Sequence, residues 1–246
     1  MKKLTNYFYH DMLTSIIHKS NASNPIIIGI CGNISVGKST FAKNTVRNLK
    51  ANFPEKKIKT ICTDSFLQSN QYLKQHGLFE QKGFPVSYDQ VKIERFKSAI
   101  LNQKAVELTA YDHRIADINP AKVVTVNRPD IIVLEGLIVL QEPLKSLLTK
   151  SIFLDANPQI VQEWYIKRCF DLKLDQKMKL QPEDFYSYAL QTWENVDVRN
   201  YLINVEPVRS QADLVLQLDS EHEVQQIQIQ SSYQIKREER HEIFDE

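Results

Sequence analysis

Hydrophobic runs alternate with amphipathic stretches along most of this chain. The short, continuous apolar runs are typical of strands buried on both faces of a sheet. We expect such strands at 25–30, 58–63, 131–136, 151–156, 212–218 and 223–230. Apolar residues at three- and four-residue spacing predict helices between them, at 4–19, 38–51, 88–102, 158–174 and 182–203. Strands alternating with helices favour an α/β fold, with a mostly parallel sheet that carries helices on both faces.

Two parts of the chain break this pattern. Residues 65–87 lack clean periodicity, so we expect a long irregular excursion there, and such loops in compact domains are usually functional or disordered. Residues 175–181 form a shorter polar break. In the helix between these parts, the spacing predicts that Val91, Phe96 and Ile100 point inward.

The organisation predicted from the sequence is a single domain over residues 1–246. Residues 1–24 contribute an amphipathic helix packed on that domain, and residues 232–246 form a charged tail. No repeat, low-complexity segment or linker divides the sequence.

Composition narrows the function classes. The 246 residues are 42% hydrophobic with a formal net charge of +1, which gives no electrostatic reason to expect nucleic acid or an anionic membrane as partner. No apolar run approaches the ~20 residues of a membrane span, and polar residues interrupt the start too early for a signal peptide. Cys31, Cys62 and Cys169 are too scattered for a disulfide framework. We therefore expect a cytoplasmic protein without a nucleic-acid or membrane partner.

The strongest motif follows the first predicted strand and precedes the first central helix. It fits the phosphate-loop pattern G-x-x-x-x-G-K-[ST], with the residues Gly32, Asn33, Ile34, Ser35, Val36, Gly37, Lys38 and Ser39, followed by Thr40. Glycines let backbone N–H groups surround phosphate oxygens, and the helix N-terminus adds positive potential. Lys38 can reach the β- and γ-phosphates, and Ser39 offers a hydroxyl to Mg²⁺. A glycine turn that merely starts a helix is the alternative.

Two carboxylates follow other predicted strands. Parallel strands end at one edge of a sheet, so Asp64 and Glu135 should face the same crevice as the phosphate loop. Asp64 could accept the proton of an attacking hydroxyl, or it could cap the next helix. Glu135 suits a magnesium site, directly or through water. The N-K-x-D stretch expected of a GTPase is missing from the sequence, which disfavours that class.

The sequence of the excursion points to a narrower group of proteins than the phosphate-loop motif does. The stretches TDSFLQSNQYLKQHGLFEQKGFPVSYD, PDIIVLEGLIVLQ, SIFLDANPQIVQEWYIKR and INVEPVRSQADLVL resemble type I (bacterial, P-loop) pantothenate kinases over roughly residues 25–230. The resemblance to the uridine kinase and phosphoribulokinase group is more distant. The resemblance to pantothenate kinases implies a P-loop NTPase-like fold. The same resemblance is the source of our expectation of a homodimer.

The resemblance also implies roles for single residues. At the nucleotide end, Lys38 matches the phosphate-loop lysine, Ser39 and Glu135 match metal-site positions, and Asp64 matches the proposed catalytic base. At the acceptor end, the resemblance implies positions that bind the substrate or face its phosphoryl group. These positions are Tyr111, His113, Tyr165, Arg168 and Asn204.

Each acceptor-end residue has a structural alternative. His113 could be a surface histidine and Tyr165 a core residue. Arg168 could pair with Glu163 or Asp171 on its own helix, although a five-residue spacing is poor for the former. Asn204 could cap a helix end.

The sequence also departs from the family pattern. Ser65 stands where T-D-G-F has glycine, which is closer to uridine kinases and phosphoribulokinases. Ile138 replaces an expected asparagine, and Cys169 and Leu172 replace aromatics that help to form the acceptor pocket. These departures bear on the identity of the acceptor.

Taken together, the sequence predicts an ATP- and Mg²⁺-dependent small-molecule kinase, with pantothenate as the leading acceptor. In this hypothesis Asp64, Lys38 and Arg168 carry the transfer, and residues 65–87 and 170–185 cover the site. A uridine-kinase-like or other small-alcohol kinase, a nucleotide-binding module without catalysis, and a GTP-driven switch are the alternatives.

Overall fold

The centre of the molecule is a six-stranded sheet. The computed structural model describes residues 2–19 and 25–230, so residue 1, residues 20–24 and the predicted charged tail lie outside the described residues. The strand order is β2-β5-β1-β6-β7-β8. All neighbours are parallel except β7 and β8. The strands are β1 Ile26–Gly32, β2 Ile58–Cys62, β5 Ile131–Glu135, β6 Lys150–Ala156, β7 Leu214–Leu218 and β8 Val224–Ile229.

The predicted α/β architecture is confirmed. All six expected strands form within a few residues of their predicted bounds. In β5 every residue is buried, and in β1 all but the first are, which explains why both read as continuous apolar runs. β8 is the edge strand and pairs only with β7, and Val224 is its only buried residue.

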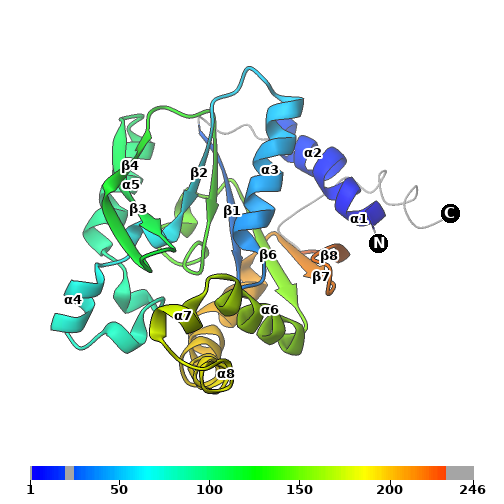
Figure 1. Ribbon diagram of the computed structural model, residues 1–246. Helices are drawn as coiled ribbons and strands as arrows, with labels where there is room; N and C mark the ends of the chain where they lie inside the picture. The colour runs from blue at the N-terminus through cyan, green and yellow to red at the C-terminus, as the bar shows by residue number, and fades with distance from the viewer. Residues whose placement is uncertain (1, 20–24, 231–246) are drawn as a thin grey trace.

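Helices cover both faces of the sheet (Figure 1). One face packs against α3 Lys38–Asn52 and the N-terminal helical segment, in which the π-helical turn Phe8–Met12 joins α1 Lys2–Tyr7 to α2 Leu13–Lys19. The other face packs against α5 Gln90–Leu101 and a two-stranded hairpin. Within residues 2–19 and 25–230, none of the helices combines the length and hydropathy that crossing a bilayer requires.

The hairpin was not predicted. It consists of β3 Val106–Asp112 and β4 Asp117–Val126, with an irregular register between Thr109 and Tyr111. Only Leu108, Asp112 and Val126 of the two strands are buried, because the hairpin lies outside the main sheet. Its apolar pattern is therefore too sparse to identify strands from the sequence.

One prediction about α5 was wrong. Val91 is 61% exposed, whereas Ile93, Phe96 and Ile100 form the buried face. Their spacing of three and four residues defines one side of the helix, and Val91 lies about 200° around the axis from Ile93. Asp89 sets the start of the helix, since its side chain accepts a hydrogen bond from the Lys92 amide at 3.0 Å.

The irregular excursion is a series of short turns rather than a free loop. It contains η2 Thr63–Phe66, α4 Asn70–Gln75, η3 Phe79–Gln81 and η4 Pro85–Ser87. A further short turn, η5 Lys145–Leu147, precedes β6. The Ser69 hydroxyl accepts a hydrogen bond from the Tyr72 amide and so satisfies a backbone donor at the start of α4.

A helical layer lies at the carboxyl end of the sheet (Figure 1). α6 Pro158–Asp171 follows β6, and the predicted polar break is the short helix α7 Leu174–Met178. The helix expected at 182–203 is helical throughout but changes type along its length. Its parts are α8 Pro182–Thr192, π-helical η6 Trp193–Asp197, α9 Val198–Asn200 and π-helical η7 Tyr201–Val205, followed by the 3₁₀ turn η8 Glu206–Gln211.

Candidate functional site

The phosphate loop joins the end of β1 to the start of α3. Gly37 precedes α3 with φ +96°, a left-handed conformation that glycine adopts without strain. A side chain at Gly32 would place its Cβ 2.4 Å from the Leu154 carbonyl oxygen, so the loop entrance also requires glycine. The two glycines therefore allow the turn and the close packing on β6.

The first residues of the loop are held by Asn33. Its side-chain oxygen accepts from the Ile34 amide at 2.7 Å, and its carbonyl oxygen accepts from Lys38 Nζ at 2.7 Å. Burial lowers the pKa of Lys38, while Glu135 and Asp64 act in the opposite direction. A buried ammonium with one carbonyl partner is suited to bind anionic oxygens.

Register brings the strand ends together. Glu135 of β5 pairs with Ile30 of β1 on one side and with Cys62 of β2 on the other. Glu135 is only 4% exposed, and its Oε1 accepts a hydrogen bond from Ser39 Oγ at 2.9 Å. A hydroxyl oxygen and a carboxylate oxygen thus lie side by side at the first turn of α3.

Asp64 lies two residues beyond the end of β2, inside the 3₁₀ turn η2. The N-cap position of that turn is Cys62, so Asp64 does not occupy the cap position that we considered as its alternative role. Its half-buried carboxylate interacts electrostatically with Lys38, Lys82, Tyr111 and His113. The carboxylate therefore lies among groups from three parts of the chain, which are the phosphate loop, the excursion and the β3–β4 hairpin.

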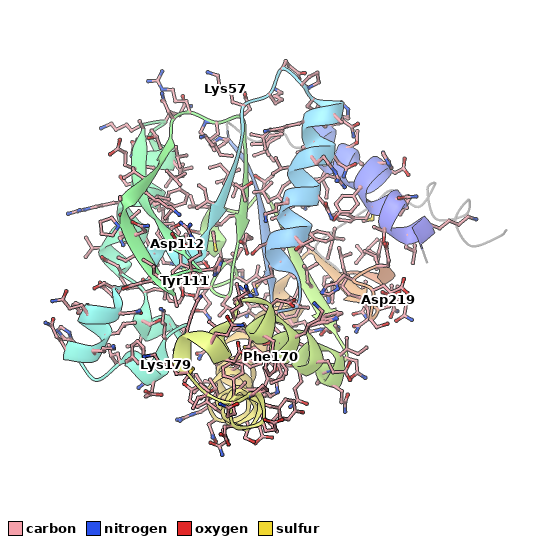
Figure 2. The ribbon with its side chains drawn as sticks, viewed as in Figure 1. Lys57, Tyr111, Asp112, Phe170, Lys179 and Asp219 are labelled. Atoms are coloured by element: carbon pink, nitrogen blue, oxygen red, sulfur yellow. The ribbon has the colours of Figure 1, made fainter. Side chains whose placement is uncertain are left out.

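Tyr111 and His113 come from the end of β3 and the turn after it, and their rings meet edge to face with centroids 5.0 Å apart. Figure 2 shows Tyr111 at the end of the hairpin near α7. Burial, and next the positive charge of Arg168, lower the pKa of His113. Lys177 of α7 donates to the carbonyl oxygen of Arg114 at 3.3 Å, which confirms that the helical layer reaches the hairpin.

Arg168 lies on the exposed side of α6. Asp171, one of the partners we considered for it, instead pairs with Lys167 at 2.6 Å. Arg168 acts electrostatically on both Tyr111 and His113. The structure therefore brings Asp64, Tyr111, His113 and Arg168 toward one region beside the phosphate loop.

Tyr165 and Asn204 contact other parts of the protein rather than Asp64 and its neighbours. Tyr165 is 9% exposed, and its ring packs on Trp193 with centroids 5.1 Å apart. Asn204 donates to Asn200 Oδ1 at 2.9 Å, and Asn200 donates to the Gly83 carbonyl oxygen at 2.9 Å. Both residues thus make internal contacts, and the second chain of contacts ties η7 to the excursion.

Two aromatic residues beside the loop were not predicted. His222, in the turn between β7 and β8, stacks on Trp164 of α6 with ring centroids 3.7 Å apart. A Cβ at Gly37 would lie 2.8 Å from His222 Cδ2, so this stack touches the phosphate loop. The residues are 58 positions apart in the sequence, and although Trp164 lies in the EWYIKR stretch, no motif indicates that it meets His222.

Lys82 connects the excursion to the hairpin, and this residue was not predicted either. Its Nζ donates to Asn70 Oδ1 at 2.7 Å and to the Ala116 carbonyl oxygen. It also lies over the Tyr111 ring, 5.1 Å from the centroid. The Asn70 amide donates to Asp117 Oδ1 at 3.0 Å, which adds a second link. The excursion is thereby held against the tip that carries Tyr111 and His113.

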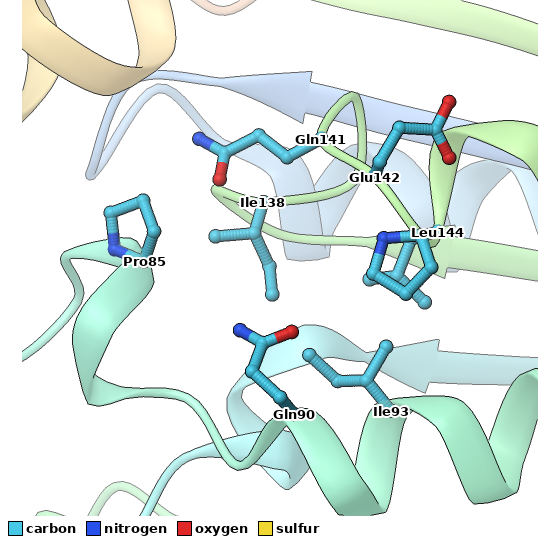
Figure 3. Close-up of a pocket in the computed structure, with 8 residues that line it drawn as sticks. Pro85, Gln90, Ile93, Ile138, Gln141, Glu142 and Leu144 are labelled. Atoms are coloured by element: carbon cyan, nitrogen blue, oxygen red, sulfur yellow. The ribbon is translucent and has the colours of Figure 1, made fainter.

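A small hollow lies elsewhere, between the start of α5 and the chain after β5 (Figure 3). Ile138, Gln90 and Ile93 contribute to its walls. It contains none of the loop residues 32–40 and none of the predicted acceptor residues. We therefore do not assign the functional site to it.

A glycine-rich loop at a helix N-terminus, a buried lysine and two strand-end carboxylates are the features of a P-loop phosphotransferase. Comparison with known proteins gives the family. The chain belongs to the phosphoribulokinase/uridine kinase family, which matches residues 27–225. It is a phosphotransferase with an alcohol group as acceptor.

Relatives agree with this class, and a solved structure matches the fold. The chain is 34% identical over 227 residues to a pantothenate kinase from Lacticaseibacillus casei, covering 85% of this chain and 73% of that protein. It is 33% identical over 255 residues to a pantothenate kinase from Haemophilus influenzae, covering 93% and 82%. The fold matches D-glycerate 3-kinase from Cryptococcus neoformans with a TM-score of 0.65 at 12% identity, covering 93% of this chain and 99% of that one.

The contacts of Lys82 generate a testable prediction. Replacing Lys82 with Met removes both hydrogen bonds and the charge over the Tyr111 ring, so amide hydrogen exchange should become at least about tenfold faster in residues 70–82 and 113–117. Lys74→Met is the matched control, because Lys74 also lies over an aromatic ring, that of Phe79, but makes that contact within the excursion. Equal exchange in the two variants would contradict the role of Lys82 as a link.

Proposed function

We propose that this chain is an ATP-dependent kinase whose acceptor is pantothenate. The observation that carries the proposal is the register of β1, β5 and β2, by which the phosphate loop, Glu135 and the turn with Asp64 leave the sheet at one edge. Curated relatives named pantothenate kinase, 34% and 33% identical to this chain, support the choice of acceptor. In this proposal the loop 32–40 holds the ATP phosphates.

The residues present fit a magnesium ion. Mg²⁺ prefers oxygen ligands and usually combines one or two side chains with phosphate oxygens and water. Ser39 Oγ and Glu135 Oε1, 2.9 Å apart, offer such a pair. Among the described residues there is no cluster of three or more His, Cys, Asp or Glu side chains suited to a metal, which agrees with an ion held partly by substrate. When bound, Mg²⁺ would neutralise charge on the phosphates.

In the proposed phosphoryl transfer, each side chain has a separate role. Asp64 accepts the proton of the acceptor hydroxyl as its oxygen attacks the γ-phosphorus, and the bond from that phosphorus to the β,γ-bridging oxygen breaks. Lys38 and Arg168 stabilise the negative charge on the transferred group. His113, with its lowered pKa, is neutral at pH 7 and serves as a hydrogen-bonding group toward the acceptor.

Covering segments complete the proposal. The excursion, held by Lys82 and Asn200, and the segment 170–185 surround the acceptor region and would exclude water during transfer. Exclusion of water limits the hydrolysis of ATP. The homodimer and the cytoplasmic location stay predictions from the sequence.

An acceptor panel tests the proposed function. ADP release should be observed with ATP and pantothenate, and the rate with uridine should be lower by at least about 10²-fold, since a site that hydrogen-bonds one acceptor discriminates strongly against another. Turnover with uridine and none with pantothenate would favour the uridine-kinase-like alternative, for which Ser65 after Asp64 is the specific observation. If the protein prefers GTP to ATP and phosphorylates no acceptor, the result would favour the GTP-driven switch.

Asp64→Asn tests the assignment of the base. The substitution keeps the size of the side chain but removes its ability to take a proton, so kcat should fall by about 10²-fold or more. The Kd for ATP, measured by calorimetry, should change little. Glu80→Gln is the matched control, because Glu80 is an exposed carboxylate on the excursion and should leave kcat unchanged. Unchanged kcat in Asp64→Asn would remove Asp64 from the mechanism.

A further inference from the structure

A buried carboxylate holds the tip of the β3–β4 hairpin together. Asp112 is the last residue of β3, next to Tyr111 (Figure 2), and is only 6% exposed. It accepts hydrogen bonds from three groups of Arg114, which are the backbone amide at 3.0 Å, Nε at 3.2 Å and Nη2 at 3.0 Å. The bond from the amide two residues ahead forms an Asx turn, so Asp112 fixes the path of the chain directly after the strand.

The same carboxylate joins the two strands of the hairpin. Its Oδ2 accepts from Asn119 Nδ2 at 3.3 Å and from Lys122 Nζ at 2.6 Å, and both donors belong to β4. Lys122 and Arg114 also form ion pairs with Asp112. Five donors thus surround one carboxylate and satisfy both of its oxygens. One side chain therefore ties β3, β4 and the turn between them together.

Asp112 lies on the other side of β3 from the acceptor residues beside it. Successive side chains of a strand point to opposite sides, so Asp112 is directed away from the side of Tyr111. The rings of Tyr111 and His113, two residues apart, meet with centroids 5.0 Å apart, as expected for side chains on one side. Asp112 therefore acts on both residues through the backbone that it fixes.

The turn after β3 has a conformation that needs support. Ala116 has φ +50°, a left-handed value that is uncommon for a residue with a side chain. From the excursion, Asn70 Nδ2 at 3.1 Å and Lys82 Nζ both donate to the Ala116 carbonyl oxygen. From α7, Lys177 Nζ donates to the Arg114 carbonyl oxygen at 3.3 Å. Both proposed covering segments therefore dock on this turn.

We propose that Asp112 is a positioning residue of the acceptor site, because the turn that it shapes directs His113 and receives both covering segments. This inference rests on the proposed kinase function, in which Tyr111 and His113 face the acceptor. The phosphate loop and Asp64 leave the main sheet, to which the hairpin does not belong. Loss of Asp112 should therefore weaken the binding of the acceptor and leave the binding of ATP as it is.

Kinetics of Asp112→Ala test the proposal. The substitution removes all five hydrogen bonds, so KM for pantothenate should rise by at least about tenfold, whereas the Kd for ATP should change by less than about twofold. Glu107→Ala is the matched control, because Glu107 is an exposed carboxylate on the same strand. Its KM for pantothenate should equal that of the parent protein.

Asp112→Asn separates the turn from the charge. The asparagine oxygen can still accept from the Arg114 amide and keep the Asx turn, although Arg114 and Lys122 lose their counter-charge. KM for pantothenate should therefore return to within about threefold of the parent value. If Asp112→Ala fails to fold, Asp112→Ser replaces it, since a serine hydroxyl makes only the weaker form of this turn, and KM should then exceed that of Asp112→Asn.

A measurement without substrate follows the same turn. The nuclear Overhauser effect between the rings of Tyr111 and His113 should be observed in the parent protein, in Glu107→Ala and in Asp112→Asn. It should be lost in Asp112→Ala. Because no acceptor is present, this result does not depend on the identity of the substrate.

The outcomes are distinct. Unchanged KM for pantothenate in Asp112→Ala would overturn the inference and leave the kinase proposal standing. A ring contact that persists in Asp112→Ala would also overturn it, and so would an equal rise of KM for pantothenate and Kd for ATP, which indicates general loosening of the fold. Absence of turnover in the parent protein with any acceptor would overturn the kinase proposal and, with it, the role of Asp112 in acceptor binding.

Discussion

The candidate site depends on the register between three parallel strands. Because Glu135 pairs with Ile30 and Cys62 at the same level, the phosphate loop, the carboxylate of Glu135 and the turn that carries Asp64 leave the sheet at one edge. A shift of one residue in β5 would turn Glu135 to the opposite face and break its hydrogen bond with Ser39. The four apolar side chains of β5, from Ile131 to Leu134, are buried on both faces of the sheet and hold the strand in this register through packing.

Burial of Lys38 lowers the pKa of its ammonium group, and desolvation of that charge costs free energy. Lys38 is desolvated and has one carbonyl partner, so its ammonium form is stabilised mainly by Glu135 and Asp64 until an anion binds. Phosphate oxygens would supply the missing hydrogen bonds, which couples occupation of the loop to the stability of this arrangement. The excursion adds acceptor-side groups without extending the sheet, and Lys82 and Asn200 hold it in place.

Much of the fold could be predicted from local sequence. Continuous apolar runs identified the strands, and the phosphate-loop pattern fixed the position of the nucleotide end. Val91 shows the limit of local reasoning, because a valine near the start of a helix fits the inward pattern until the positions of Ile93 and Phe96 define the buried side. The hairpin β3–β4 escaped prediction since it buries few side chains.

The remaining site residues depend on tertiary contacts. His222 reaches Gly37 and Trp164 only because β8 follows β7 at that end of the sheet, and Trp193 meets Tyr165 only through the packing of η6 on α6. The resemblance to pantothenate kinases supplied Tyr165 and Asn204, but their neighbours Trp193 and Asn200 could be identified only from the structure.

The central claim is that Asp64 faces both the terminal phosphate and the acceptor hydroxyl. A crystal structure with a non-hydrolysable ATP analogue, Mg²⁺ and pantothenate tests it most directly. We predict an Asp64 carboxylate oxygen within about 2.6–3.2 Å of the reacting hydroxyl, with that hydroxyl in line with the γ-phosphorus. An acceptor bound with its hydroxyl away from Asp64, or an Asp64 side chain directed out of the site in that complex, would contradict the claim.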